Sequence, residues 1–431
     1  MTTKIEKQHL KNIQKIFNDF LWSDKPAKVR HSTIINLRDE GGIHMLDLKC
    51  QYKATKLPWI WRILKPSSWN CVARLYFETI GGLELLLYSD FAAKTIDFLP
   101  PFYKEILLYF KEIVYTEGSG EFIIWNNSNI TIKKRTIFNR HWYDNGIIYI
   151  HDLMNNDRNI YTYDEFRLKY NINTTKQEFN QIRRSVVRYM ENNVSATDNI
   201  WSVRPKIDFK STIFKFRSGT TIDIANAKCK QFYREFLLFE ASDATALWKW
   251  KDNYKIEEQT FYDSMVQAHN STKEPKLISF QFKILHNIVN NGSNLLKWKI
   301  RDTNLCEMCK NAVDTIVHEL TNCKTTVDIL KKLSEETAIG HLFRNLSKRE
   351  LIFGCNKTAK NHILMIVKYV IHISRQNQFP FSLKVLYSEI YKRIIVDKQQ
   401  LNPTAFNKKW KELDILCKNA LEFVSQYRNV P

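Results

Sequence analysis

The sequence predicts a mainly α-helical protein made of several helical subdomains. Its 431 residues include only 11 glycines and 10 prolines, which is too few for a sheet-rich fold with many tight turns. Along most of the chain, apolar residues recur at the spacing of one helix face, with charged residues between them. Because 44% of the residues are hydrophobic, a chain of this length can bury more than one core.

Interruptions of the helical pattern predict four segments. The polar stretch 192–220 lacks helical periodicity and is expected to be a linker. The apolar runs at 122–125 and 130–132, joined through Asn126-Asn127, allow either one short β-hairpin near 121–140 or an extended arm. The predicted segments are a helical connector at 1–66, a helical middle region with a basic arm at 67–220, a helical region with a cysteine-rich motif at 221–330, and a C-terminal helical region at 331–431.

The chain carries a large excess of positive charge. Lys and Arg number 65 against 45 Asp and Glu, which gives a formal net charge of +20. An excess of this size favours a polyanionic partner, nucleic acid first and an anionic membrane surface second. Composition alone also allows a basic protein with no such partner.

The N-terminal sequence shows no signal for secretion. Charged residues are spread through the first thirty positions, so no apolar core of a secretory signal can be placed there. The longest apolar run, Ile363–Ile373, is about half of the length needed to span a bilayer and contains Lys368. The sequence therefore predicts an intracellular protein without a membrane span, and a buried helix at this run.

Three of the eight cysteines lie close together with a histidine. Cys306, Cys309, His318 and Cys323 form a C-x2-C-x8-H-x4-C pattern. Two cysteines separated by two residues can wrap a backbone turn around one zinc ion, and the later histidine and cysteine complete a tetrahedron. Four protein ligands leave no open position for a reacting water, so we expect one structural Zn²⁺ in a small zinc knuckle at 306–323. The alternative is a chance grouping of small buried side chains.

The residues around this motif extend the pattern beyond the four expected ligands. They include Phe280-Gln281-Phe282-Lys283-Ile284-Leu285-His286, Leu295-Leu296-Lys297-Trp298, Leu305-Cys306-Glu307-Met308-Cys309 and His318-Glu319-Leu320-Thr321-Asn322-Cys323. This pattern resembles the zinc-binding module that follows the polymerase in LINE-type (non-LTR) retrotransposon reverse transcriptases.

Shorter matches to the same family are spread over nearly the whole chain. The family's segment after the polymerase thumb is similar to Phe20-Leu21-Trp22, Glu40-Gly41-Gly42-Ile43 and Leu46-Asp47-Leu48. Its stretch between thumb and zinc module is similar to Trp125-Asn126-Asn127, Trp142-Tyr143-Asp144-Asn145-Gly146-Ile147 and Tyr163-Asp164-Glu165-Phe166. Its sequence after the zinc module is similar to Leu351-Ile352-Phe353-Gly354. By this resemblance the connector at 1–66 corresponds to the post-thumb segment.

The resemblance implies a region that binds and positions nucleic acid. Its expected partners are template RNA and target DNA during target-primed reverse transcription, and the polymerase and endonuclease domains of the full-length family protein. The expected location is a ribonucleoprotein particle of the nucleus and cytoplasm.

The polymerase chemistry itself is not expected in this chain. No Asp-Asp pair occurs in the sequence, whereas the palm of a reverse transcriptase needs one to hold two metal ions. The chain is therefore expected not to be an enzyme, and to be a truncated copy or a C-terminal fragment of one. A protein-interaction scaffold and an inert remnant of an element are the alternatives.

Phosphate contacts are expected in three basic stretches. Residues 276–301 contain five cations and no carboxylate, whereas the loop 306–323 has one lysine against three carboxylates and is expected to bind phosphate poorly. The acid-free stretch 122–143 interleaves four cations with tryptophan and phenylalanine, a mixture that suits a single strand or a heteroduplex backbone. The third stretch, 200–220, includes Arg204 and Lys206.

Nine residues of the first two stretches are the expected nucleic-acid contacts. They are Lys133, Lys134, Arg135, Arg140, Lys276, Lys283, Lys297, Lys299 and Arg301. The alternative for each is an ordinary solvated charge. Trp298 is expected to pack in the core, with base stacking as its alternative.

Overall fold

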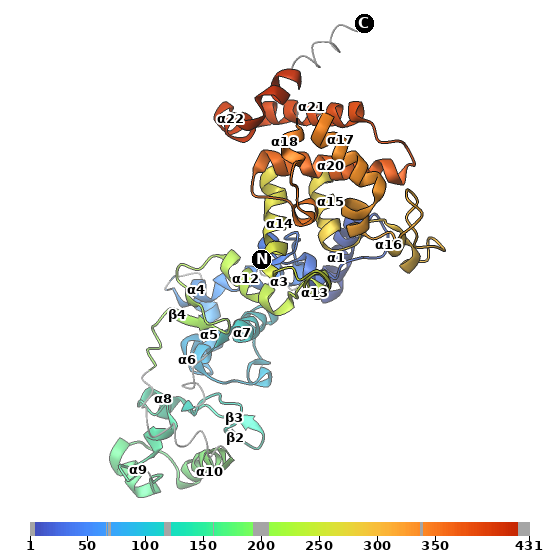
Figure 1. Cartoon of the computed structure of the whole chain (residues 1–431). Helices are drawn as coiled ribbons and strands as arrows, with labels where there is room; N and C mark the ends of the chain where they lie inside the picture. The colour runs from blue at the N-terminus through green and yellow to red at the C-terminus, as the bar shows by residue number, and fades with distance from the viewer. Residues whose placement is uncertain are drawn as a thin grey trace. The chain divides into compact units, whose positions relative to one another are not determined.

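The chain forms two compact units in a computed structural model. The structure describes residues 5–65, 67, 70–115, 122–157, 159–192, 207–336 and 339–420. Helices account for 62% of the structure and strands for 5%, which confirms the predicted mainly α fold (Figure 1). Unit 1 contains Met1–Lys25 and Leu46–Glu240, and unit 2 contains Pro26–Met45 and Ala241–Pro431. The four segments expected from the sequence stay a prediction.

Unit 1 contains helices and a three-stranded antiparallel sheet. The strands are β1 (Val114–Tyr115), β4 (Ile213–Phe216) and β5 (Thr221–Asp223), in the order β1-β4-β5. Helix α3 packs against α12 and α7. The helices before and after the sheet strands are α1 (Lys7–Trp22), α3 (Leu48–Lys56), α4 (Pro58–Leu64), α5 (Cys71–Glu78), α6 (Leu83–Tyr88), η3 (Ala93–Ile96), α7 (Pro101–Ile113) and α12 (Cys229–Glu240).

The segment 192–220 is in part a strand, so the linker prediction is wrong for that part. Strand β4 alternates exposed and buried residues, with Phe214 and Phe216 facing the core. This period of two, over only four residues, was too short to be recognised in a polar stretch. Residues 193–206, which include Arg204 and Lys206, lie outside the described part of the chain.

A second part of unit 1 surrounds a core of aromatic residues. It contains β2 (Thr131–Ile132), β3 (Arg135–Thr136), α8 (Arg140–Asp144), η5 (Ile150–Leu153), α9 (Tyr163–Tyr170) and α10 (Lys176–Asn192). Strands β2 and β3 form a two-stranded antiparallel hairpin, which confirms the short hairpin expected near 121–140. The turn of this hairpin is Lys133-Lys134. It is not Asn126-Asn127, because the apolar run 122–125 does not pair with the run 130–132: Ile123 forms a bridge with Tyr149 instead.

Unit 2 is a layered set of helices. It contains α2 (His31–Ile34), η1 (Arg38–Glu40), α13 (Thr245–Tyr254), α14 (Glu258–Ser271), α15 (Pro275–Leu285), α16 (Gly292–Lys297), η6 (His318–Asn322), α17 (Lys324–Glu336), α18 (Gly340–Phe343), α19 (Lys348–Phe353), α20 (Thr358–Gln376), α21 (Leu383–Gln400), α22 (Pro403–Trp410) and η7 (Lys411–Leu413). The central helix is α20, which contacts α14, α15, α21 and α22.

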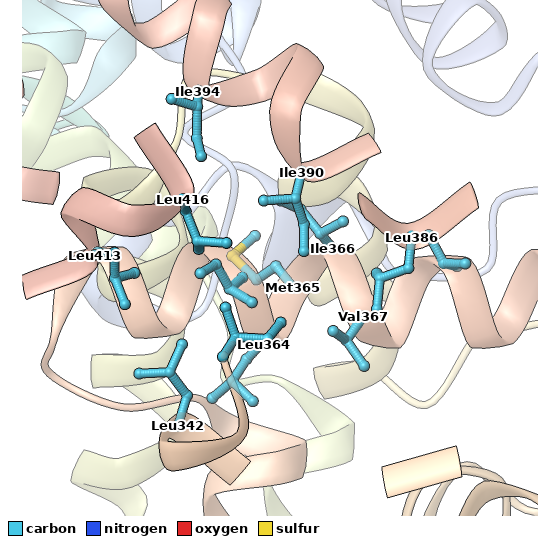
Figure 2. Packing of buried hydrophobic residues seen from close by; sticks show 14 of the residues in the cluster. Leu342, Leu364, Met365, Ile366, Val367, Leu386, Ile390, Ile394, Leu413 and Leu416 are labelled. Carbon is cyan, nitrogen blue, oxygen red and sulfur yellow. The ribbon is translucent and has the colours of Figure 1, made fainter. Parts of the chain in front are cut away.

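Helix α20 is buried on nearly all sides, as its apolar sequence predicts. Leu364, Ile366 and Val367 pack against residues of α21 such as Leu386 and Ile390 (Figure 2). A helix that is apolar all round must be covered on every face. None of the described helices combines the length and the apolar character needed to cross a lipid bilayer.

Candidate metal centre and cationic surfaces

The first two cysteines of the motif lie in a tight turn. An isolated bridge between Leu305 and Val313 closes this turn, and the Cys306 N–H donates to the Ala312 carbonyl at 2.8 Å. The Lys310 N–H donates to the Cys306 carbonyl at 2.8 Å, and Lys310 has a φ of 57°. The left-handed residue reverses the chain directly after Cys309. Both thiols therefore lie on the inner side of one backbone turn.

The other two residues of the motif lie at either end of a π-helical turn. The Cys323 N–H donates to the His318 carbonyl at 2.8 Å, five residues back. In a regular α-helix residues five apart point about 140° away from each other, because each step turns by about 100°. The wider π turn reduces that angle. The H-x4-C spacing can thereby bring both side chains to one point.

The four side chains converge on one small volume. Their ligand atoms all lie within 4.8 Å of one another, with Cys306 Sγ 3.9 Å from Cys323 Sγ and Cys309 Sγ 3.3 Å from His318 Nε2. Bonds of about 2.3 Å to sulfur and 2.0–2.1 Å to nitrogen give a tetrahedron with edges of about 3.8 Å between sulfurs and 3.5 Å between sulfur and nitrogen. The cluster could therefore hold one metal ion, as the spacing predicted.

The surroundings of Cys306 favour its thiolate form. Burial acts to raise the pKa of this thiol, but the backbone N–H groups of Cys309 and Met308 and the Arg375 guanidinium act in the other direction. The pKa of Cys306 lies below its ordinary value as a result. A thiolate is the form that binds a metal ion.

Helix α20 supplies a buried charge network to the motif. Arg375 Nη2 donates to Cys306 Sγ at 3.3 Å and to Asp314 Oδ1 at 2.6 Å, and His372 Nδ1 lies 2.7 Å from Glu319 Oε1. All four charged or titratable partners, Arg375, Asp314, His372 and Glu319, are at most 8% exposed. These buried contacts fix the orientation of the loop that carries the four candidate ligands.

Most of the negative charge counted in the loop 306–323 is not on its surface, and its expected poor binding of phosphate stays a prediction. Of its three carboxylates, those of Asp314 and Glu319 point inward. The third, Glu307, is 3.1 Å from Arg301 Nη1. Counting charges along the sequence could not show this, because the partners on α20 are more than 50 residues away.

No family model matches this chain, and no curated protein sequence matches it. Its function is therefore inferred from its own residues.

In unit 2, four of the five predicted cations are exposed. Lys276 and Lys283 lie on α15, Lys297 ends α16 and Lys299 follows it, and none forms an ion pair within the described part of the chain. Arg301 differs, because it pairs with Glu307 and donates to the Leu305 carbonyl at 3.2 Å. Its contacts stabilise the turn that carries Cys306 and Cys309.

The backbone and Trp298 limit this region in two ways. Helix α15, which carries Lys276 and Lys283, ends at Leu285, because Asn287 adopts a φ of 53° and stops it. Trp298 is half-buried, and Lys28 Nζ lies 3.4 Å from the centre of its ring. At least one face of this indole is thus already covered.

In unit 1, the hairpin presents three of its four predicted cations. Lys133, Lys134 and Arg135 are exposed and have no ion pair among the described residues. Arg140 donates to the Glu78 carbonyl and lies 3.7 Å from Asp144. These contacts of Arg140 stabilise the local structure around α8.

The tryptophans interleaved with these cations are not available for base stacking. Trp125 and Trp142 are completely buried, and Trp125 Nε1 donates to the Ile147 carbonyl at 2.7 Å. Phe138 packs against Trp125. The expected use of Trp125 and Trp142 beside these cations is therefore wrong, because sequence composition does not distinguish a buried ring from an exposed one.

Sequence reasoning missed a second pair of cations beside the hairpin. Arg184 and Arg188 lie one turn apart on the exposed side of α10, opposite the buried Val186. The Ser185 hydroxyl donates to the Thr131 carbonyl at 2.9 Å and holds this helix against β2. The available signal was the four-residue spacing of two arginines on an amphipathic helix.

Proposed function

We propose that this chain is a nucleic-acid-binding, zinc-stabilised region similar to the C-terminal part of a LINE-type retrotransposon reverse transcriptase. In this proposal Cys306, Cys309, His318 and Cys323 hold one structural Zn²⁺. The chain would position template RNA or target DNA for a polymerase carried by other domains of the family protein. Its role is binding and not catalysis.

The observation that carries the proposal is the free positive charge in unit 2, the unit that contains the candidate metal centre. Lys276, Lys283, Lys297 and Lys299 are exposed without an ion pair among the described residues, while the carboxylates of Asp314 and Glu319 are buried. A surface with this charge distribution attracts phosphates and releases counterions when it binds them.

A protein-interaction scaffold is the second candidate, and helix α1 favours it. Ile13, Ile16, Phe17 and Phe20 recur at the spacing of one helix face and are all exposed, Phe20 at 88%. Exposed apolar stripes of this kind often mark protein contacts.

Salt dependence of binding separates the two candidates. If the lysines neutralise phosphates, the logarithm of the affinity for a single strand should fall with the logarithm of salt concentration by about 0.7 for each contact. The double variant Lys297→Gln, Lys299→Gln should flatten that slope by about 1.4. Fluorescence anisotropy with a labelled RNA at several salt concentrations measures it.

The matched control is Lys331→Gln, Lys332→Gln, which removes two exposed lysines of α17 in the same unit. Its slope should equal that of the wild type. If the wild-type protein binds no nucleic acid, or if both double variants change the slope equally, the proposal is wrong and the scaffold becomes the better account.

A further inference from the structure

The β2–β3 hairpin and the adjacent helix α10 carry five exposed cations in unit 1. We call Lys133, Lys134, Arg135, Arg184 and Arg188 the hairpin–α10 surface. The two elements are in contact through the Ser185 to Thr131 hydrogen bond, and Figure 1 shows the hairpin beside α10. All five side chains are exposed. Three cations from a turn and two from a helix are thus presented by neighbouring elements.

The positive charge of this surface is not cancelled by carboxylates nearby. None of its five cations has an ion pair among the described residues. Glu178, near the start of α10, accepts hydrogen bonds from Asn139 at 2.6 Å and from Thr174 at 2.9 Å. Glu191 is the exposed carboxylate at the other end of the helix. The surface therefore keeps a net positive charge.

The turn holds its two lysines in an unusual backbone conformation. Lys133 and Lys134 have φ values of 50° and 63°. A two-residue hairpin turn with both residues in the left-handed region normally uses Asn-Gly, since these residues tolerate positive φ best. Lysine is less favourable there. The charge of the two side chains, rather than the turn geometry, is then the property that explains lysine at these positions.

The same part of unit 1 offers no exposed tryptophan, tyrosine or phenylalanine ring among described residues 122–157 and 159–192. The exposed ring in these ranges is the smaller imidazole of His141 on α8. Proteins that bind single strands without sequence preference combine a basic groove with aromatic stacking platforms. Here the cations are present and no large aromatic ring is exposed among the described residues, which favours recognition of the phosphate backbone alone.

We infer that the hairpin–α10 surface binds a nucleic-acid duplex through its phosphates and does not read the bases. A duplex suits it because paired bases need no stacking partner and both strands present closely spaced phosphates. The inference rests on the proposed function and adds to it a site, outside unit 2, and the form of nucleic acid that this site takes.

The test uses two double variants of the full chain. Lys133→Asn, Lys134→Gly removes two charges and installs the residue pair that this turn prefers, so the fold should be at least as stable. Arg184→Gln, Arg188→Gln removes two charges with a good helix former. Each should flatten the salt slope for a random-sequence DNA duplex by about 1.8, at about 0.9 for each lost contact.

Lys228→Gln, Lys230→Gln is the matched control, because it removes two exposed lysines at α12 of the same unit. It should leave the duplex slope unchanged. Anisotropy is measured with the duplex, with a second duplex of different sequence, and with one of the separated strands. Equal affinity for both duplexes is expected, and weaker binding of the single strand.

The possible failures are distinguishable. A wild-type protein that binds no nucleic acid contradicts the proposed function. Binding that is lost in Lys297→Gln, Lys299→Gln but unchanged in both hairpin–α10 variants overturns this inference alone. Tighter binding of the single strand, or a strong preference for one duplex sequence, also overturns it.

Discussion

Removing the metal is expected to unfold the loop that carries Cys306, Cys309, His318 and Cys323. The two backbone turns bring three thiols and one imidazole within 4.8 Å of one another, and without an ion no metal bond would join these turns. A structural zinc site of this kind contributes on the order of 10 kcal/mol to the stability of the segment that it organises. We expect chelation to make this segment accessible to protease.

Limited proteolysis followed by mass spectrometry measures this effect. Chelated protein should be cut between about residues 299 and 323, and added Zn²⁺ should restore resistance. The Cys355→Ser variant, which removes a cysteine outside the motif, should behave like the wild type before and after chelation. Identical cleavage patterns with and without chelator would contradict a structural metal.

The second large effect is expected at Arg375. Its guanidinium is buried and donates to Asp314 at 2.6 Å and to Cys306 Sγ at 3.3 Å. Arg375→Ala would leave the Asp314 carboxylate buried without its cation, and breaking a buried pair on one side destabilises by about 3–5 kcal/mol. Loss of a residue that orients a ligand also weakens metal binding by about 10–100-fold.

Urea denaturation and competition with a zinc chelator measure the two effects separately. Lys392→Ala, which breaks an ion pair of a lysine that is 63% exposed, should cost at most about 1 kcal/mol. Combining Arg375→Met with Asp314→Asn removes both charges and should recover part of the lost stability. If Arg375→Ala behaves like Lys392→Ala in both assays, α20 does not support the metal centre.

Local patterns in the sequence were sufficient to predict much of the fold. The apolar spacing of α1 and the continuous apolar run of α20 correspond to helices in the structure. The four candidate ligands are likewise within 18 positions of each other, so spacing alone could place them on one knuckle. Each of these features depends on residues that are neighbours in the chain.

Features that depend on distant residues could not be predicted. The turn at Lys133-Lys134 lacks the Asn-Gly signal of a hairpin. The register of the hairpin strands also depends on the distant pairing of Ile123 with Tyr149. The inward orientation of Asp314 and Glu319 depends on Arg375 and His372 of α20. Long-range burial of charge leaves no local periodicity in the sequence.

Zinc content per chain tests the central claim of a zinc-stabilised protein most directly. The protein is purified, dialysed against metal-free buffer and analysed for its metals, as wild type, Cys309→Ser and Cys355→Ser. We predict one zinc per chain in the wild type and in Cys355→Ser, and little or none in Cys309→Ser. Absence of zinc from the wild type, or equal amounts in all three proteins, would contradict the assignment of Cys306, Cys309, His318 and Cys323 as its ligands.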